Sequence, residues 1–410
     1  MTTALEGALG GLYARASRGM RLGTGAMQAA CDALGNPERA FEVVHVAGTN
    51  GKGSVSAMVE SILRADGRRT GLYTSPHLCR FAERIRVGGA PLDDDTLARL
   101  LGFVLVAAPD LSFFETTTLA ALVAFREAKV DVAVLEVGIG GRLDATNVVP
   151  APRAAAITRI AFDHTDRLGD TLVAIAREKA GIAKPGLEIV LGPVEPDVVQ
   201  AIDEVARARG ATTLRADLDA GARRFVESAT IGLPGAHQIE NAEVAYLLGT
   251  RMGASARAIA EGIAQVRWPG RLERLERPDG PYLLDAAHNP DGAASLARYL
   301  TETKERFTLV FGALSDKPWT EMLDLLAPLG TERVYVAPPL IAGVNRAAAD
   351  PRDFAARHPG SVASGVAEAC RIARSRTKER DLVVICGSIF LVGEARGHLL
   401  GLPRDPPIPL

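Results

Sequence analysis

The sequence predicts an α/β protein in which a parallel-sheet domain with a phosphate-binding loop (P-loop) is followed by a second, smaller α/β domain. Apolar β-branched runs alternate with helical patterns along the chain, which is typical of parallel sheets covered on both faces. The first of these runs breaks into a glycine-rich turn that contains a lysine, at residues 48–54. The strand–helix series begins again after a Pro-Gly pair at residues 269–270. We therefore expect two α/β domains.

Length and composition agree with two domains and exclude several classes of protein. A chain of 410 residues is too long for one ordinary core, and 47% hydrophobic residues can fill two cores. A net charge of −2 shows no bias toward polyanions, so we expect no nucleic-acid partner. The four cysteines lack metal-site or redox spacing and indicate reduced thiols. Without a secretory signal or a membrane-length apolar run, the sequence predicts a cytoplasmic protein with no membrane partner.

The expected larger domain covers residues 1–272. Residues 1–40 read as helices, with breaks at 19–25 and 34–37. Further strands are expected at residues 43–47, 69–73, 130–137, 154–160 and 188–191, and helices at residues 97–108, 117–129 and 171–180. Polar residues stand where these strands end: Lys52, Ser75, Glu136, Asp163 and His164. Ligands of open α/β sheets gather at the carboxyl ends of the strands, so these residues predict the functional site.

The expected smaller domain covers residues 273–410. A second series of strands is predicted at residues 282–285, 308–312, 333–336 and 382–386. Each of several strand ends carries a polar motif, at residues 285–290, 312–317 and 387–388. The proline-rich tail from Pro403 to Leu410 is expected to be a short extended cap.

The loop at residues 48–54 has the chemistry of a phosphate site. A strand, a glycine turn, Lys52 and a following helix place backbone N–H groups and a positive charge toward an anion. The match to the P-loop pattern is imperfect, because Gly53 separates Lys52 from Ser54 and Val46 holds the place of the first glycine. The alternative is a tight turn with a surface lysine. We interpret the loop as binding ATP phosphates.

Two strand-end residues are candidate magnesium ligands. Glu136 ends an apolar strand, and a buried carboxylate there must bind a metal or accept bonds from backbone N–H groups. Mg²⁺ beside ATP takes a few protein oxygens together with phosphates and waters. His164 is the second candidate, although imidazole is not the favoured ligand of Mg²⁺ and the residue could be structural.

For other polar residues, the sequence pattern alone does not favour a functional role over a structural one. Ser75 either caps the following segment or binds a metal through its hydroxyl. Lys179, near a helix end, reads as a lysine that faces solvent. Asp285 and His288 precede Asn289-Pro290, where a turn-forming role competes with a catalytic one.

These motifs, in this order, resemble the folylpolyglutamate synthase/dihydrofolate synthase family, a branch of the Mur ligase superfamily. The resemblance covers essentially the whole chain. The matching motifs lie at residues 48–54, 74–78, 114–117, 136–147, 163–166, 177–182, 268–271 and 285–290. It implies a P-loop domain of the Mur ligase central type, followed by a Rossmann-like domain of the glutamate ligase C-terminal type.

The resemblance also implies roles for particular residues. The ATP-binding residues would be Thr49, Asn50, Gly51, Lys52, Gly53 and Ser54, with Asn241, Arg271 and Asp285 across the domain boundary. Two Mg²⁺ ions would be held by Ser75, Glu136, His164 and an N6-carboxylated Lys179. The catalytic residues would be Lys52, Lys179, His164 and His288. The pterin or folate pocket would be lined by Phe114, Glu115, Thr117, Leu143, Asp144 and Ala145, with residues 21–23 nearby.

The implied activity is that of an ATP-dependent ligase, a monomer, that joins L-glutamate to dihydropteroate or to tetrahydrofolate and its polyglutamates. ATP would activate the acceptor carboxylate as an acyl phosphate, which the amine of glutamate then attacks. One alternative is a Mur-type ligase that acts on a cell-wall precursor, but only some 40 residues precede the P-loop. Another is a P-loop ATPase or binding module, which would leave the motifs of the second domain unexplained.

Overall fold

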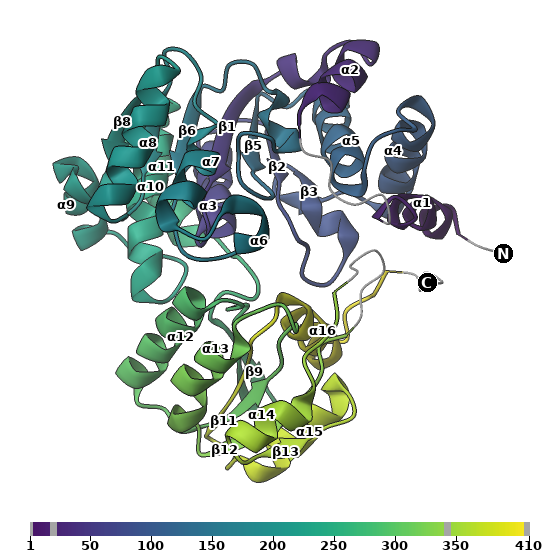
Figure 1. Cartoon of the computed structure of the whole chain (residues 1–410), viewed down its shortest axis with the longest axis vertical. Coiled ribbons are helices and arrows are strands. Elements are labelled where there is room, and N and C mark those ends of the chain that lie inside the picture. Colours follow the sequence, from purple (N-terminus) through teal and green to yellow (C-terminus); the bar gives the residue numbers. More distant parts are fainter. Residues whose placement is uncertain (1–2, 17–22, 340–345, 406–410) are drawn as a thin grey trace.

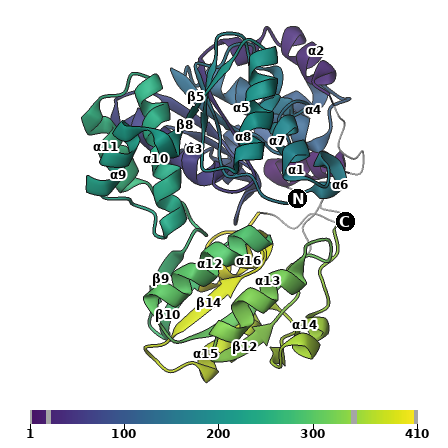
Figure 2. The ribbon, with the colours of Figure 1, turned by 60° about the vertical axis from the view of Figure 1, so that its left-hand side comes forward.

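The computed structural model describes residues 3–16, 23–339 and 346–405, and within them the chain forms two α/β domains that face each other (Figures 1 and 2). The first domain is built on an eight-stranded sheet in the order β4-β3-β2-β5-β1-β6-β7-β8. Its strands are β1 (Glu42–Ala47), β2 (Thr70–Tyr73), β3 (Ile85–Val87), β4 (Ala90–Pro91), β5 (Val132–Glu136), β6 (Ala154–Ile157), β7 (Glu188–Leu191) and β8 (Thr212–Arg215). The expected α/β class is confirmed.

The centre of this sheet is parallel, and one edge is not. Strands β2, β5, β1, β6, β7 and β8 pair in parallel. The hairpin β3–β4 joins β2 antiparallel. The expectation of an all-parallel sheet therefore fails at this edge, where the strands are too short to show a periodic pattern.

Helices cover both faces of the first sheet because successive residues of the buried strands point to opposite sides. On one face, Val44 and Val46 pack on α3 (Lys52–Ala65), α10 (Ala236–Arg251) and α11 (Ala256–Gln265). The other face carries, toward one end, α1 (Ala4–Tyr13), α2 (Gly25–Ala33), α4 (Asp94–Ala107) and α5 (Phe113–Glu127). Toward the other end it carries α7 (Leu172–Ala180) and α8 (Pro196–Ala208). The remaining helices of this domain are the short α6 (Thr165–Leu168) and α9 (Ala220–Ser228).

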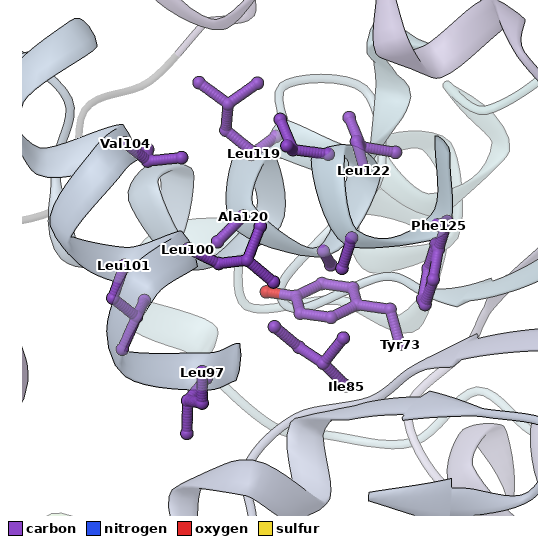
Figure 3. Close-up of a cluster of buried hydrophobic side chains, with 14 of the residues drawn as sticks. Tyr73, Ile85, Leu97, Leu100, Leu101, Val104, Leu119, Ala120, Leu122 and Phe125 are labelled. Carbon is purple, nitrogen blue, oxygen red and sulfur yellow. The ribbon is translucent and has the colours of Figure 1, made fainter. Parts of the chain in front are cut away.

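The core beneath α4 and α5 is large and mostly apolar. Tyr73 of β2 lies fully buried among Leu100, Leu119 and Phe125 (Figure 3). Ser112 and Glu115 form a capping box at the start of α5, so this helix begins four residues before the expected start at Thr117. This earlier start brings Phe114 and Glu115 into the first turn of the helix.

The second domain has a six-stranded sheet in the order β13-β12-β11-β14-β10-β9, with β9 antiparallel to β10. Its strands are β9 (Glu273–Arg277), β10 (Gly280–Leu284), β11 (Phe307–Phe311), β12 (Glu332–Tyr335), β13 (Ser361–Val362) and β14 (Leu382–Cys386). The helices are α12 (Pro290–Thr303), α13 (Trp319–Leu326), α14 (Pro351–Arg357), α15 (Val366–Arg376) and α16 (Ile389–Leu400). Helices α12 and α13 pack with one core, and α15 and α16 with another.

The two domains touch closely where the loop after β2 meets α16. A Cβ atom at Gly393 would lie 1.8 Å from the carbonyl oxygen of Leu78, so the two backbones meet without a side chain between them. Beside this contact, the Cys79 thiol donates to the Gly393 carbonyl oxygen at 3.4 Å. Near the end of the described chain, Asp405 accepts a hydrogen bond of 2.6 Å from the Phe81 amide. The expected cap formed by the tail can be followed only to residue 405.

Candidate active site

A cavity of about 530 Å³ lies between the two domains. The first domain lines it with loops after β1, β2, β5 and β6, and the second domain with loops after β10, β11 and β14. The cavity thus meets the carboxyl ends of parallel strands from both sheets, where the sequence placed the functional site. It brings together most of the predicted residues: Thr49, Asn50, Gly51, Lys52, Gly53, Ser54, Ser75, Phe114, Glu115, Glu136, Leu143, Asp144, Ala145, His164, Lys179, Asn241, Arg271, Asp285 and His288.

The P-loop is held tightly by its neighbours. Gly51 has a φ of +89°, and a Cβ atom there would lie 2.4 Å from the side-chain oxygen of Asn241. Thr158 donates its hydroxyl to the carbonyl oxygen of Asn50 at 2.7 Å. Helix α3 starts at Lys52, whose ammonium group donates to the carbonyl oxygen of Thr49 at 3.1 Å. The helix N-terminus and a lysine therefore face one cavity, as an anion site requires.

Glu136 is buried at the end of β5. One of its carboxylate oxygens accepts a hydrogen bond from the Ser75 amide at 3.0 Å. Burial raises the pKa of Glu136, while the charges of Lys52 and Arg271 and the Ser75 N–H oppose that rise. A backbone N–H thus takes one oxygen of Glu136, while the other makes no hydrogen bond within the described residues, so its role as a metal ligand stays a prediction.

Lys179 does not face solvent, so the interpretation from the pattern alone was wrong. Only 4% of the residue is exposed, and its Nζ donates to the carbonyl oxygen of Gly48 at 2.7 Å. Burial lowers the pKa of Lys179 to about 7, and the charge of Lys52 adds to the effect. A lysine with such a pKa is largely a neutral amine at slightly alkaline pH.

Asp163 lies beside Lys317 and two histidines, one from each domain. Its carboxylate forms an ion pair with Lys317, lies 3.5 Å from His288 Nε2 and lies 3.9 Å from His164 Nε2. Burial alone would raise the pKa of Asp163, but the His288 hydrogen bond and the charge of Lys317 hold it well below its usual range. The pKa of His164 falls to about 4 because the ring is buried, so His164 is a neutral imidazole with a lone pair to offer.

Asp285 and His288 both have turn-forming contacts at the start of the second domain. The two oxygens of Asp285 accept hydrogen bonds of 2.9 Å from the amides of Leu272 and Ala287. His288 Nδ1 lies 2.9 Å from the carbonyl oxygen of Ala286 and so carries a proton. Both residues also line the cavity, so a functional role stays a prediction beside the turn role that the structure shows.

The part of the cavity near α5 has an acceptor without a partner. Ser112 donates its amide and hydroxyl to one oxygen of Glu115, and the other oxygen is buried with no hydrogen-bond partner in the described chain. Asp144 is held by four hydrogen bonds, from Gly138, Ile139 and both donors of Thr146. Gly23 lines this end of the cavity, whereas residues 21 and 22 lie outside the described part of the chain.

Thr117 is not brought to the cavity. It lies two residues after Glu115 in α5, about 200° around the helix, and its buried hydroxyl donates to the carbonyl oxygen of Phe113 at 2.8 Å. The helix period therefore separates Thr117 from the other predicted pocket residues.

Arg84 is a cavity residue for which the sequence gave no signal. Its guanidinium lies 5.3 Å from the centre of the Phe81 ring and 5.5 Å from that of Phe113. Its Nε donates to His77 Nδ1 at 2.9 Å, and burial lowers its pKa. Lys317 was also missed as a site residue, although the motif at residues 312–317 had been recognised as a strand end. Only tertiary packing brings these two cations to the site.

Searches for other kinds of site gave negative results within the described residues. No group of three or more His, Cys, Asp or Glu side chains is arranged to hold a metal ion there. No helix in the same ranges is both long enough and apolar enough to cross a membrane.

Known proteins resemble this chain over nearly its whole length. The family model described as "Mur ligase middle domain" matches residues 46–249, and "Mur ligase, glutamate ligase domain" matches residues 270–389. "Folylpolyglutamate synthase" of Lacticaseibacillus casei is 34% identical over 404 residues, covering 90% of this chain and 92% of the relative. Two solved structures are similarly close.

Escherichia coli FolC in complex with DHPP and ADP has a TM-score of 0.83 and 32% identity, over 93% of this chain and 94% of that one. A bifunctional folylpolyglutamate synthase/dihydrofolate synthase with Mn, AMPPNP and L-glutamate bound has a TM-score of 0.83 and 34% identity, over 93% of this chain and 95% of that one. The resemblance seen in the sequence motifs is thereby confirmed. The chain belongs to the folylpolyglutamate synthase/dihydrofolate synthase family of Mur ligases.

Proposed function

We propose that this protein is an ATP-dependent ligase that joins L-glutamate to dihydropteroate, to folates that already carry glutamate, or to both. The observation that supports it most is one interdomain cavity lined both by the P-loop and by Glu115, whose second carboxylate oxygen is buried without a hydrogen-bond partner in the described residues. Relatives whose structures contain ADP and DHPP, or AMPPNP, Mn and L-glutamate, support the same substrates for this chain.

We assign the nucleotide to the end of the cavity between the P-loop and the second domain. Residues 51–54 would bind the phosphates through backbone N–H groups and the Lys52 ammonium, with Thr49 and Asn50 beside them in the cavity lining. Asn241, Arg271 and Asp285 line the same end and would complete the nucleotide site. This assignment divides the chain at about residue 272, next to the start of β9 at Glu273.

The residues present fit a divalent metal. Glu136 offers one free carboxylate oxygen beside the Ser75 side chain, and buried carboxylates are stable when a cation neutralises them. We propose Ser75 and Glu136 for one Mg²⁺, and His164 with a carboxylated Lys179 for a second. When bound, such ions neutralise the oxygens of the transferring phosphoryl group.

The acceptor is assigned to the end of the cavity near α5. The free Glu115 oxygen is a buried acceptor, and the amino and ring N–H groups of a pterin would satisfy it. Phe114, Leu143 and Ala145 provide apolar surface for the ring. Arg84 carries a buried positive charge in the same cavity, which suits a substrate carboxylate.

The reaction that follows has two steps. An oxygen of the acceptor carboxylate attacks the γ-phosphorus of ATP, and ADP leaves with the bond electrons. The amine of glutamate then attacks the acyl carbon, phosphate leaves, and the amine loses a proton. Lys52 lowers the repulsion between two anions in the first step, and in the second step the departing phosphate takes the proton that the amine loses. The surrounding domains exclude water, which would otherwise hydrolyse the acyl phosphate.

The carboxylation of Lys179 has its own physical support. The neutral amine favoured by a pKa of about 7 attacks CO₂, which forms an N–C bond and releases one proton. The product is an anion with oxygens suited to Mg²⁺. We expect Lys179→Ala to be nearly inactive and to be partly rescued by millimolar formate or acetate. Lys179→Arg should stay inactive, because a fixed cation cannot replace an anion. An active Arg variant, or a bare ammonium beside two bound metals, would contradict the carbamate.

The function is tested with purified protein, ATP, Mg²⁺ and labelled glutamate. Dihydropteroate and tetrahydrofolate serve as alternative acceptors, and a cell-wall precursor serves as the control acceptor. Glutamate incorporation that depends on a pterin acceptor is the expected result. ATP hydrolysis without incorporation would instead indicate an ATPase, and incorporation into the precursor would indicate a different Mur-type ligase.

A further inference from the structure

Four side chains, which we call the P-loop clasp, join the P-loop region to the second domain. They are Asn50 and Arg159 of the first domain and Asn289 and Asp291 of the second. Asn50 and Asn289 exchange amide hydrogen bonds of 3.2 and 3.0 Å across the domain boundary. Asp291 accepts from Asn50 Nδ2 at 2.6 Å with one oxygen and from Arg159 Nε at 2.8 Å with the other. Each member from the first domain therefore bonds a member from the second.

Both polar atoms of the Asn50 side chain form hydrogen bonds to the second domain. Its amide oxygen accepts from Asn289, and its amide nitrogen donates to Asn289 and Asp291. The side chain is thus turned to the second domain, while the backbone N–H of Asn50 donates to the carbonyl oxygen of Arg159 and its carbonyl oxygen accepts from Thr158. A motif residue that the sequence assigned to ATP is in this arrangement a contact between domains.

Arg159 joins the clasp to the backbone of the loop. Its carbonyl oxygen accepts from the amides of Thr49 at 2.8 Å and Asn50 at 3.3 Å. Its side chain reaches Asp291, so one residue contacts both the loop backbone and the second domain. A movement of Asp291 away from the first domain would therefore remove a partner from the side chain of Asn50 and leave Arg159 Nη1 with Glu240, 3.5 Å away in the first domain.

The clasp is anchored on the second-domain side by helix α12. Asn289 is the N-cap of this helix and accepts from the Gly292 amide at 2.8 Å with the same oxygen that meets Asn50. Asp291 lies in the first helical turn, where a carboxylate is favoured by the helix dipole. The clasp residues of the second domain are thus fixed to a long helix, and they move only when the domain moves.

We propose that Asp291 is a positioning residue that couples the closed arrangement of the domains to the shape of the P-loop. The P-loop then has its ATP-ready geometry only when the second domain is docked. Asp291 touches no substrate in this role; it acts through Asn50 and Arg159. The assignment rests on the proposed nucleotide site.

The test uses the full-length protein and the variants Asp291→Asn and Asp353→Asn. Asp353 is a matched control, because it is an exposed carboxylate in the first turn of α14 in the same domain. We expect Asp291→Asn to lower kcat roughly tenfold or more, which is typical of one lost charge-assisted hydrogen bond. Its melting temperature should stay equal to that of the control. A kcat for Asp291→Asn equal to that of Asp353→Asn would overturn the proposal.

A double-mutant cycle separates a shared clasp from independent effects. If Asn50 and Asp291 act together, Asn50→Ala combined with Asp291→Asn should lower kcat no further than the worse single variant. If the effects of the two substitutions on kcat multiply in the double variant, Asn50 and Asp291 act independently and the coupling is refuted. Failure of the wild-type protein to ligate any acceptor would instead refute the proposed function, so the two failures are distinguishable.

Discussion

Lys52 contributes charge to the site and little to the packing of the fold. It is partly exposed, and its only hydrogen bond within the described residues goes to the carbonyl oxygen of Thr49. Its charge is also felt by Glu136, whose pKa it lowers against the effect of burial. Removal of Lys52 should therefore affect chemistry far more than stability.

We predict that Lys52→Ala lowers the ligation rate on the order of a hundredfold or more, the usual cost of one lost electrostatic contact to a transition state. Initial rates with labelled glutamate check the activity, and thermal melts check the fold. Lys378→Ala, at an exposed position in the second domain, is the control. Near-normal turnover of Lys52→Ala with an unchanged KM for ATP would contradict the assignment of residues 48–54 as the phosphate-binding loop.

His45 is a second residue whose burial has a measurable effect. Thr146 gives its hydroxyl proton to Asp144, so it must accept from His45 Nε2, 2.8 Å away. The other ring nitrogen, Nδ1, is buried without a partner in the described residues. Burial, with a smaller effect from Lys184, lowers the pKa of His45 to about 3.

This pKa predicts that the protein loses stability in acid. Between the unfolded pKa of 6.5 and the folded value of about 3, the unfolded chain binds more protons at this position. Above pH 6.5, His45 is neutral in both states and does not lower the free energy of unfolding. As the pH falls below 6.5, the free energy of unfolding decreases by at most about 1.4 kcal/mol per pH unit. His45→Gln should flatten the pH dependence of urea unfolding, and His398→Gln, which is exposed, should not. If both variants keep the wild-type dependence of the free energy of unfolding on pH, His45 is not the source of the acid sensitivity.

The sequence predicted site residues well where they follow buried strands. Glu136 and His164 stand where strands end, and the geometry of parallel sheets brings such positions to one edge. The burial of Lys179 could not be predicted from the pattern, since it depends on the backbone of Gly48 more than a hundred residues earlier in the chain. Arg84 was missed because its place in the cavity depends partly on Phe113, which comes from another helix, α5.

At the scale of elements, the buried strands were the most predictable. The bounds of β7 and β14 agree with the expected residues, because each is a short apolar run that ends at polar or glycine residues. The strands β3, β4, β8, β9 and β13 were missed. They lie at or near sheet edges, where the strands are very short or polar and charged residues replace the apolar pattern.

Helix α16 gives a prediction with an internal control. An alanine at Gly393 would place its Cβ against the backbone of Leu78, whereas one at Gly397 in the same helix would meet nothing within 4 Å. We expect Gly393→Ala to lower ligation activity strongly by pushing the domains apart. Gly397→Ala should be neutral, or stabilise the helix by up to about 1 kcal/mol. Ligation rates and thermal melts of both variants check this, and equal activity would show that the contact tolerates a methyl group.

At the scale of the whole molecule, each domain has its own cores. The three clusters of the first domain contain buried residues up to Val266, and the two clusters of the second domain begin at Leu272. The cavity, in contrast, needs residues from both domains. We therefore expect the first domain to fold without the second, whereas the proposed chemistry needs both domains.

A fragment of residues 1–270 should accordingly fold but fail to ligate glutamate. Circular dichroism and a cooperative melt check folding, and the labelled-glutamate assay checks activity against the full chain at equal concentration. The fragment lacks Arg271, Asp285 and the second-domain half of the P-loop clasp. If it forms product at the full-length rate, the interdomain site is wrong.

The thiol at the domain contact has a practical consequence. Cys31, Cys370 and Cys386 are buried, whereas Cys79 is partly exposed and bonded to Gly393 of the facing helix. Burial also raises the pKa of Cys79 to about 11, so little thiolate is present at neutral pH while the domains are together. Separation of the domains would expose this one sulfur first. We therefore expect the rate at which Cys79 reacts with a colour-forming thiol reagent to report how often the two domains separate. This measurement needs no engineered label.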